Sequence, residues 1–236
     1  MAHRPAPVRR VAATATVGYS VPWPCRGVGV VLLAMPKPHR RTATRVRDGR
    51  VQKKQNWALD RGDYRVLRQD EIRLDRRDPG PGYRHLLTLN QLREFLNLLP
   101  VWDEVAIGLD AIVLDTRSDP EILGRHTEGV VAVCAWEREL WSVGDLSFVS
   151  SAFELLKTLD VKGRVLPGDR YELRWTEAQA RAFQLLDVLP HELGHHHDRI
   201  TSRRQRTAGR GEPYAEWYAA QVRETVWPAY TTMFEV

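Results

Sequence analysis

The sequence predicts an α+β domain in which a small antiparallel or mixed sheet packs on one helix that is followed by a second helix. Three observations lead to this prediction. Two segments open with a capping box and continue with apolar residues at helical spacing. Runs with the alternation or the β-branched composition of strands lie between them. The second of these helices ends in a histidine motif, His191-Glu-Leu-Gly-His195.

Length and charge divide the chain into a tail and a domain. The 236 residues, 43% of them apolar, suffice for one sizeable core, and we expect one globular domain over residues 51–236. Residues 1–50 hold ten Arg and Lys against the single acid Asp48, whereas the rest has four more acidic than basic side chains. This predicts a basic, disordered tail and excludes a nucleic-acid face spread over the domain. Nucleic-acid contact through the tail is the alternative.

The beginning of the chain has no helical or strand periodicity. Met35 starts a stretch that would serve equally well as an N-terminus. We therefore interpret residues 1–34 as an over-extended gene start.

Cysteine usage and hydropathy indicate the compartment. Cys25 and Cys134 form no CxxC pattern, so neither a disulfide framework nor a thiolate zinc site is predicted, and a reducing compartment fits. The apolar run at residues 27–35 is about half the length of a bilayer span. No signal-peptide pattern is present. We expect a cytoplasmic protein that does not contact membranes.

The first predicted elements are a helix and a strand. Thr88-Leu-Asn-Gln91 has the capping-box pattern, and leucines and Phe95 then follow at helical spacing until Pro100. From Glu104 to Leu114 the period changes to two, which predicts a strand. One face of that strand would carry Val105, Ile107 and Leu109.

The next elements lead to the motif. Residues 129–136 and 139–143 have strand composition and predict a hairpin. A helix at about residues 147–159 and a turn at Pro167-Gly168 follow. Thr176-Glu-Ala-Gln179 is a second capping box, and it opens the helix that carries the histidines.

The spacing of the motif predicts a metal site. Residues four apart lie on one face of a helix, so His191 and His195 can present their imidazoles to one ion. Two imidazoles and a carboxylate would bind Zn²⁺ and leave a position for water, whose pKa the metal lowers. Glu192 points about 100° away and is suited to act as the general base.

The surrounding helix carries two further features. Gly194 is interpreted as leaving room beside the metal. Pro190 removes an intrahelical hydrogen bond and disfavours α geometry at Leu189, so we expect a kink with a new turn that begins at His191. His196 and His197 are interpreted as exposed polar residues.

The third ligand is expected on a downstream helix. Pro213 suits the first position of that helix, and Glu216 within it is the candidate ligand. Glu212 is the alternative, although it is also suited to capping the helix. Asp198 lies one turn beyond His195 and is better placed to support the ligands than to bind the ion.

Residues 176–226 resemble the gluzincin clan of zinc peptidases, in which a His-Glu-x-x-His helix precedes a helix that supplies a zinc-binding Glu. Here Glu216 follows His195 by 21 residues. The order of elements is similar to compact minimal gluzincins, with some likeness to peptidases of the ImmA/IrrE type. The resemblance implies a zincin-like fold, a peptide or protein substrate and hydrolysis of peptide bonds. It also implies that an extended substrate pairs with a strand above the zinc, for which the 129–143 hairpin is the candidate.

The sequence leaves several alternatives open. Tyr214, Tyr218, Tyr230 and His126 are equal candidates for the group that stabilises an oxyanion. The alternative function is a regulatory or binding module that zinc stabilises and that keeps the fold with little or no catalysis. In a third interpretation the five-residue motif is accidental, and its histidines are surface groups of an unrelated α+β protein.

Overall fold

A computed structural model describes residues 46–47, 50–51, 64, 72–202 and 209–234. The chain forms two units, Met1–Trp57 and Ala58–Val236. In the first, β1 (Val46–Arg47) pairs antiparallel with β2 (Arg50–Val51). The rest of the predicted tail, and with it the proposed gene start at 1–34, lies outside the described residues. All further elements belong to the second unit.

The main sheet has four strands in the order β3-β5-β7-β6. Strands β3, β5 and β7 are parallel, and β6 runs antiparallel to β7. All residues of β5 and β7 are buried, which explains why these strands are apolar except for Asp115 at the end of β5. The sheet is therefore mixed, within the range predicted. Its strands are β3 (Arg73–Arg76), β5 (Ala111–Asp115), β6 (Gly124–Thr127) and β7 (Val130–Cys134).

The strand predicted from Glu104 begins later than expected. Residues Trp102–Val105 form a short helix, α2, and the strand β5 starts only at Ala111. Ile107 is 64% exposed, whereas Val105 and Leu109 are buried. The two buried residues are four apart, a spacing that suits a helical turn as well as a strand. The apparent period of two was therefore misleading.

The hairpin predicted at 129–143 is also wrong. Strand β7 pairs with β5 and β6, whereas β9 (Trp141–Asp145) pairs with β11 (Arg170–Arg174) in a second sheet. Between them, β8 (Trp136–Glu137) pairs with β4 (Tyr83–Arg84). A fully buried central strand needs a neighbour on each side, and a local hairpin supplies only one.

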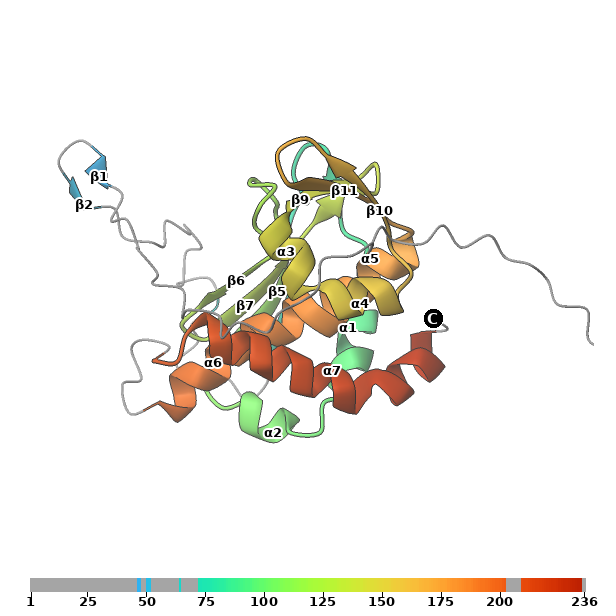
Figure 1. The fold of residues 1–236 in the computed structure, drawn as a ribbon. Helices are drawn as coiled ribbons and strands as arrows, with labels where there is room; N and C mark the ends of the chain where they lie inside the picture. The colour runs from blue at the N-terminus through green and yellow to red at the C-terminus, as the bar shows by residue number, and fades with distance from the viewer. Residues whose placement is uncertain (1–45, 48–49, 52–63, 65–71, 203–208, 235–236) are drawn as a thin grey trace, which may run out of the picture. The chain divides into compact units, whose positions relative to one another are not determined.

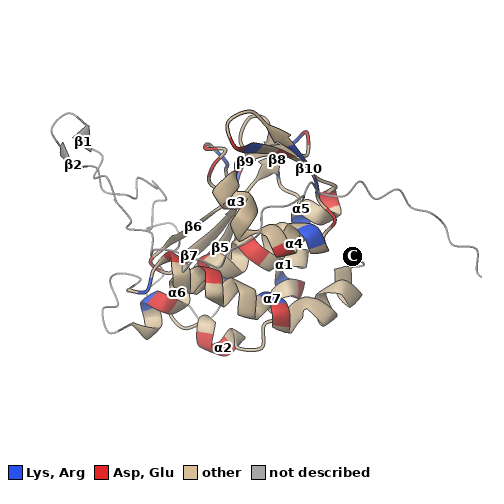
Figure 2. Ribbon diagram, in the orientation of Figure 1, with Lys and Arg blue, Asp and Glu red and all other residues tan. Residues whose placement is uncertain are grey.

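The second sheet is antiparallel, in the order β10-β11-β9. The predicted turn at Pro167-Gly168 joins β10 (Lys162–Leu166) to β11, with Gly168 at φ +77°. Basic and acidic residues lie close together along the strands of this sheet (Figure 2), where Glu172 pairs with Arg164 and Arg174 at 2.9 Å. Its charge is therefore mixed.

Both capping boxes form as predicted. Thr88 caps α1 (Leu89–Leu96), and Thr176 caps α5 (Glu177–Phe183), each with the reciprocal glutamine contact. The helix expected at 147–159 is split at Ala152 into α3 (Leu146–Ser151) and α4 (Phe153–Thr158). None of the helices among the described residues combines the length and the apolar character needed to cross a bilayer.

The helix that carries His191 and His195 has a π turn just before Pro190. Residues Gln184–Val188 form the π-helical segment η2, and α6 (Leu189–Thr201) follows without interruption. The N–H of Leu189 bonds to the carbonyl of Gln184, five residues back. The wider π turn gives room to the proline ring. The expected new turn at His191 is therefore replaced by a π turn that ends before Pro190.

Helix α6 lies between the main sheet and the last helix, α7 (Glu212–Phe234) (Figure 1). Gly194 lies at the contact with α7. A Cβ at residue 194 would lie 2.9 Å from the Cα of Ala215 and 3.1 Å from the Cβ of Tyr218. Gly194 thus makes room for the second helix, rather than beside the metal as the sequence suggested.

Gly194→Ala should destabilise the protein by about 1–2 kcal/mol, because the overpacking against α7 outweighs the better helix propensity of alanine. Urea unfolding of the metal-free protein measures the change. Ala215→Gly in the same chain should not restore stability, because the nearest obstructing atom belongs to the backbone. Unchanged stability of Gly194→Ala would contradict the close approach.

Candidate metal centre

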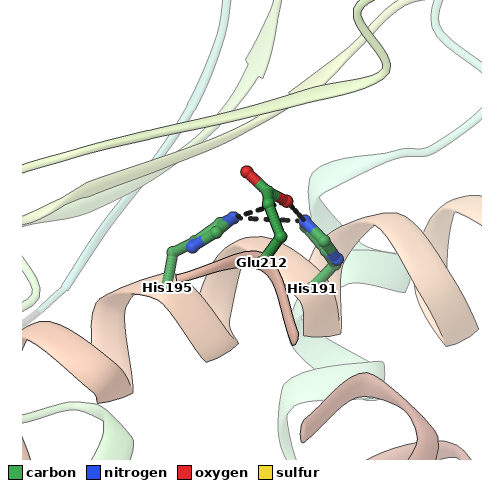
Figure 3. Close-up of side chains that lie close together, drawn as sticks. All are labelled: His191, His195 and Glu212. Carbon is green, nitrogen blue, oxygen red and sulfur yellow. Dashed lines mark hydrogen bonds and ion pairs between the residues drawn. The ribbon is translucent and has the colours of Figure 1, made fainter. Parts of the chain in front are cut away.

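Three side chains from two helices converge at the beginning of α7. Figure 3 shows His191 and His195 of α6 and Glu212 of α7 pointing toward one another. The Nε2 atoms of the two histidines are 3.2 Å apart. Glu212 Oε2 lies 3.3 Å from Nε2 of His191 and 3.5 Å from Nε2 of His195. The three ligand atoms form a nearly equilateral triangle.

This triangle has the size of a tetrahedral metal site. Zinc binds nitrogen and carboxylate oxygen at about 2.0–2.1 Å, so neighbouring ligands of a tetrahedral ion are about 3.3–3.4 Å apart. The observed separations of 3.2, 3.3 and 3.5 Å match that edge length. The donor set of two imidazoles and one carboxylate is one that zinc uses in catalytic sites.

Glu212, and not the predicted Glu216, lies against the imidazoles. Glu212 is the first residue of α7, and the carbonyl of Gly211 accepts the first bonds of that helix from Tyr214 and Ala215. Glu216 is one turn further along α7 and is exposed. Helix α7 begins one residue before the position that Pro213 indicated, and this first residue, Glu212, faces α6. In the sequence, Glu212 ranked below Glu216 as a ligand because it is also suited to capping the helix.

Contact within the cluster shifts the proton affinities of Glu212 and His191. Hydrogen bonds from His191 and His195 lower the pKa of Glu212 below its usual value. Burial by itself would lower the pKa of His191, but the hydrogen bond with Glu212 and the negative charges of Glu192, Glu212 and Asp187 together outweigh it, so the pKa is raised. Both shifts favour an ion pair between His191 and Glu212, and a bound cation would displace the imidazole proton.

Glu192 lies beneath the nearest strand of the sheet. It is 8% exposed, and burial raises its pKa to about 7. A Cβ at Gly124 of β6 would lie 2.7 Å from both Cγ and Oε1 of Glu192 and 2.8 Å from Cγ1 of Val188. Only a glycine lets the strand pass this close to the glutamate. Strand β6, rather than the predicted 129–143 segment, therefore borders the site.

Two residues further along β6, His126 packs against the second histidine of the motif. Its ring is nearly parallel to that of His195, with centroids 6.3 Å apart, and meets His196 edge-on at 5.7 Å. Burial lowers the pKa of His126 to about 3, so the ring is neutral at physiological pH. Its Nε2 is buried without a hydrogen-bond partner among the described residues.

The three tyrosines that the sequence offered, with His126, as oxyanion-stabilising groups contact residues outside the triangle. The hydroxyl of Tyr214 is 2.7 Å from Nδ1 of His197, and Tyr218 stacks on the same imidazole. Tyr230 is fully buried and packs on Phe95. Of the four candidates, His126 alone has a described ring contact with a histidine of the triangle.

His196 and His197 are not the exposed residues that the sequence suggested. His196 is fully buried, and its Nε2 donates to the carbonyl of Ile107 at 3.0 Å. Nε2 of His197 lies 3.1 Å from Glu104 Oε1, in the turn of helix before Ile107. Both side chains therefore fasten α6 to the segment around α2. The histidine tract gave no signal that distinguished anchors from ligands.

Comparisons of the chain with protein-family models, curated proteins and solved structures find no match.

Replacing Glu212 by Ala should weaken zinc binding by at least about 100-fold, because removal of a ligand costs more than the 10–100-fold typical of supporting partners. Glu216→Ala should bind zinc like the unaltered protein. Competition with a chromophoric chelator measures both affinities. If Glu216→Ala weakened zinc binding and Glu212→Ala did not, Glu216 would be the third ligand.

Proposed function

We propose that the chain is a zinc-dependent peptidase of gluzincin type with a zincin-like fold. The observation that carries the proposal is the triangle of His191, His195 and Glu212 ligand atoms, with the buried Glu192 next to it on the same helix. The third ligand follows His195 by 17 residues rather than 21. The accidental origin of the motif is disfavoured, because three ligand atoms at tetrahedral spacing are not expected of unrelated surface groups.

Each residue of the site has a role in the proposed reaction. Bound zinc would polarise the scissile carbonyl and lower the pKa of a water molecule. His191, His195 and Glu212 hold the ion and leave one position open. Glu192 accepts the proton of the attacking water and passes it to the leaving amine. A carboxyl whose pKa is about 7 can both accept and release a proton near neutral pH.

The substrate is proposed to be an extended peptide that lies along the site beside β6. The closeness of Gly124 to Glu192 supports this position, because a peptide guided by β6 would bring its carbonyl toward the general base. The family resemblance implied the same mode of binding, and the strand that serves it here is β6.

The alternative of a regulatory or binding module has lost part of its basis. Pro190 and the arginine-rich loop between the two site helices favour this alternative in the sequence. The π turn at Gln184–Val188 accommodates the proline while α6 continues through the motif, and residues 203–208 of the loop lie outside the described residues. We therefore favour the peptidase.

Glu192→Gln should reduce cleavage of a proteome-derived peptide library by at least about 100-fold, because the amide cannot accept the proton. Zinc content should stay at one ion per chain. Mass spectrometry of the cleaved peptides and metal analysis of the same sample measure the two quantities. Full activity in Glu192→Gln would exclude the proposed mechanism, and stoichiometric zinc without cleavage in the unaltered protein would favour the binding module.

Gly124→Ala should lower the rate by about 10- to 100-fold while zinc stays bound, because the new methyl group displaces the Glu192 carboxylate from its position. Peptide turnover and zinc affinity are compared in one preparation. A loss of zinc together with activity would instead mean that the methyl group disturbs α6 itself.

A further inference from the structure

Asp198 is a buried carboxylate that takes no part in the proposed reaction. It lies on α6 three residues after His195, and its side chain is 0% exposed. Oδ1 accepts hydrogen bonds from Ser202 Oγ at 2.8 Å and from Arg210 Nε at 2.7 Å. Oδ2 accepts from the backbone N–H groups of Arg210 at 2.8 Å and Gly211 at 2.9 Å. Each carboxylate oxygen thus accepts two hydrogen bonds.

Three of these four donors come from the two residues immediately before Glu212. The N–H of Gly211 is held by Asp198, and its carbonyl accepts the bonds that begin α7. Gly211 has φ +67°, a conformation that a glycine adopts without strain. The carboxylate therefore determines the residue at which α7 begins, and Glu212 is the first residue after that point.

The contact is strong enough to act as an anchor. Burial alone would raise the pKa of Asp198, but the hydrogen bonds from Arg210, Gly211 and Ser202 lower it, so the group is a buried anion. Hydrogen bonds to an ionised acceptor are about twice as strong as neutral ones, and a buried charge without them is costly. The Arg210 guanidinium also lies 3.6 Å from the ring centre of Tyr214 in the first turn of α7.

We propose that Asp198 is a positioning residue of the metal centre, which holds the Glu212 carboxylate against the imidazoles before a metal ion binds. One helix then supplies two ligands and, less than one turn later, the anchor of the third. The proposal rests on the metal-binding part of the proposed function and does not depend on peptidase activity. It assigns the affinity for zinc in part to a residue that does not touch the ion.

A double-mutant cycle tests whether Asp198 influences zinc affinity through Glu212. Asp198→Ala should weaken zinc binding by about 10- to 100-fold in the unaltered chain. In a Glu212→Ala chain the same substitution should change the affinity by less than about twofold, because the ligand it positions is absent. Equal losses in both backgrounds, or none in the unaltered chain, would overturn the proposal. Absence of zinc binding by the unaltered chain would instead overturn the metal site itself.

A milder variant and a control separate positioning from general stability. Asp198→Asn keeps the size of the side chain and one acceptor oxygen. It replaces Asp198→Ala in the double-mutant cycle if that variant does not fold. Arg223→Gln breaks another link of α7, to Asp187 at 2.9 Å, far along the helix from Glu212. It should lower the thermal midpoint without weakening zinc binding. Weakening in Arg223→Gln equal to that in Asp198→Asn would reduce Asp198 to a structural role.

The visible absorption of bound Co²⁺ reports the coordination of the ion and does not depend on the folding stability of the protein. The intact triangle should give the intense bands of tetrahedral cobalt, and Asp198→Asn should give weaker bands, because water replaces the displaced carboxylate and raises the coordination number. A spectrum of Asp198→Asn identical to that of the unaltered chain would show that Glu212 keeps its place without the anchor.

Discussion

The close packing of α6 between a strand and a second helix is the constraint on which the rest of the site depends. Two glycines set it, one on each side. At Gly124 the strand β6 approaches the side chain of Glu192, and at Gly194 the helix itself approaches the backbone of α7. A Cβ at either place would push a functional element away. The packing of α7 on α6 at Gly194 places the start of α7, with Glu212, near the two imidazoles, and β6 lies against Glu192.

Two carboxylates of the same helix show how partners decide protonation. Glu192 and Asp198 are both buried, and burial alone raises the pKa of either group. Asp198 has four hydrogen-bond donors and stays ionised, which suits an anchor. Glu192 lies beside the cluster of His191, His195 and Glu212, and burial raises its pKa to about 7, which suits a group that exchanges a proton. Their difference lies in the neighbouring residues, since the side-chain chemistry is nearly the same.

The π turn before the motif shows a local conflict that the helix resolves without a break. Pro190 cannot donate the hydrogen bond that an α-helix requires, and a regular helix would set its ring against a carbonyl. The five-residue π segment widens the turn just ahead of it. Asp187 in that segment pairs with Arg223 of α7, which fastens the widened turn to the second helix. Because α6 continues without interruption past Pro190, the imidazoles of His191 and His195 keep their helical spacing.

The sequence by itself determined the features that depend on residues within about one turn of each other. These include the α+β class, the capping boxes at Thr88 and Thr176, and the placement of His191, Glu192 and His195 on one helix. Tertiary structure decided which strand borders the site and which glutamate reaches the imidazoles. The choice between Glu212 and Glu216 depends on where α7 begins, and Asp198 fixes that point across more than ten residues. Local periodicity carries no information about such a contact.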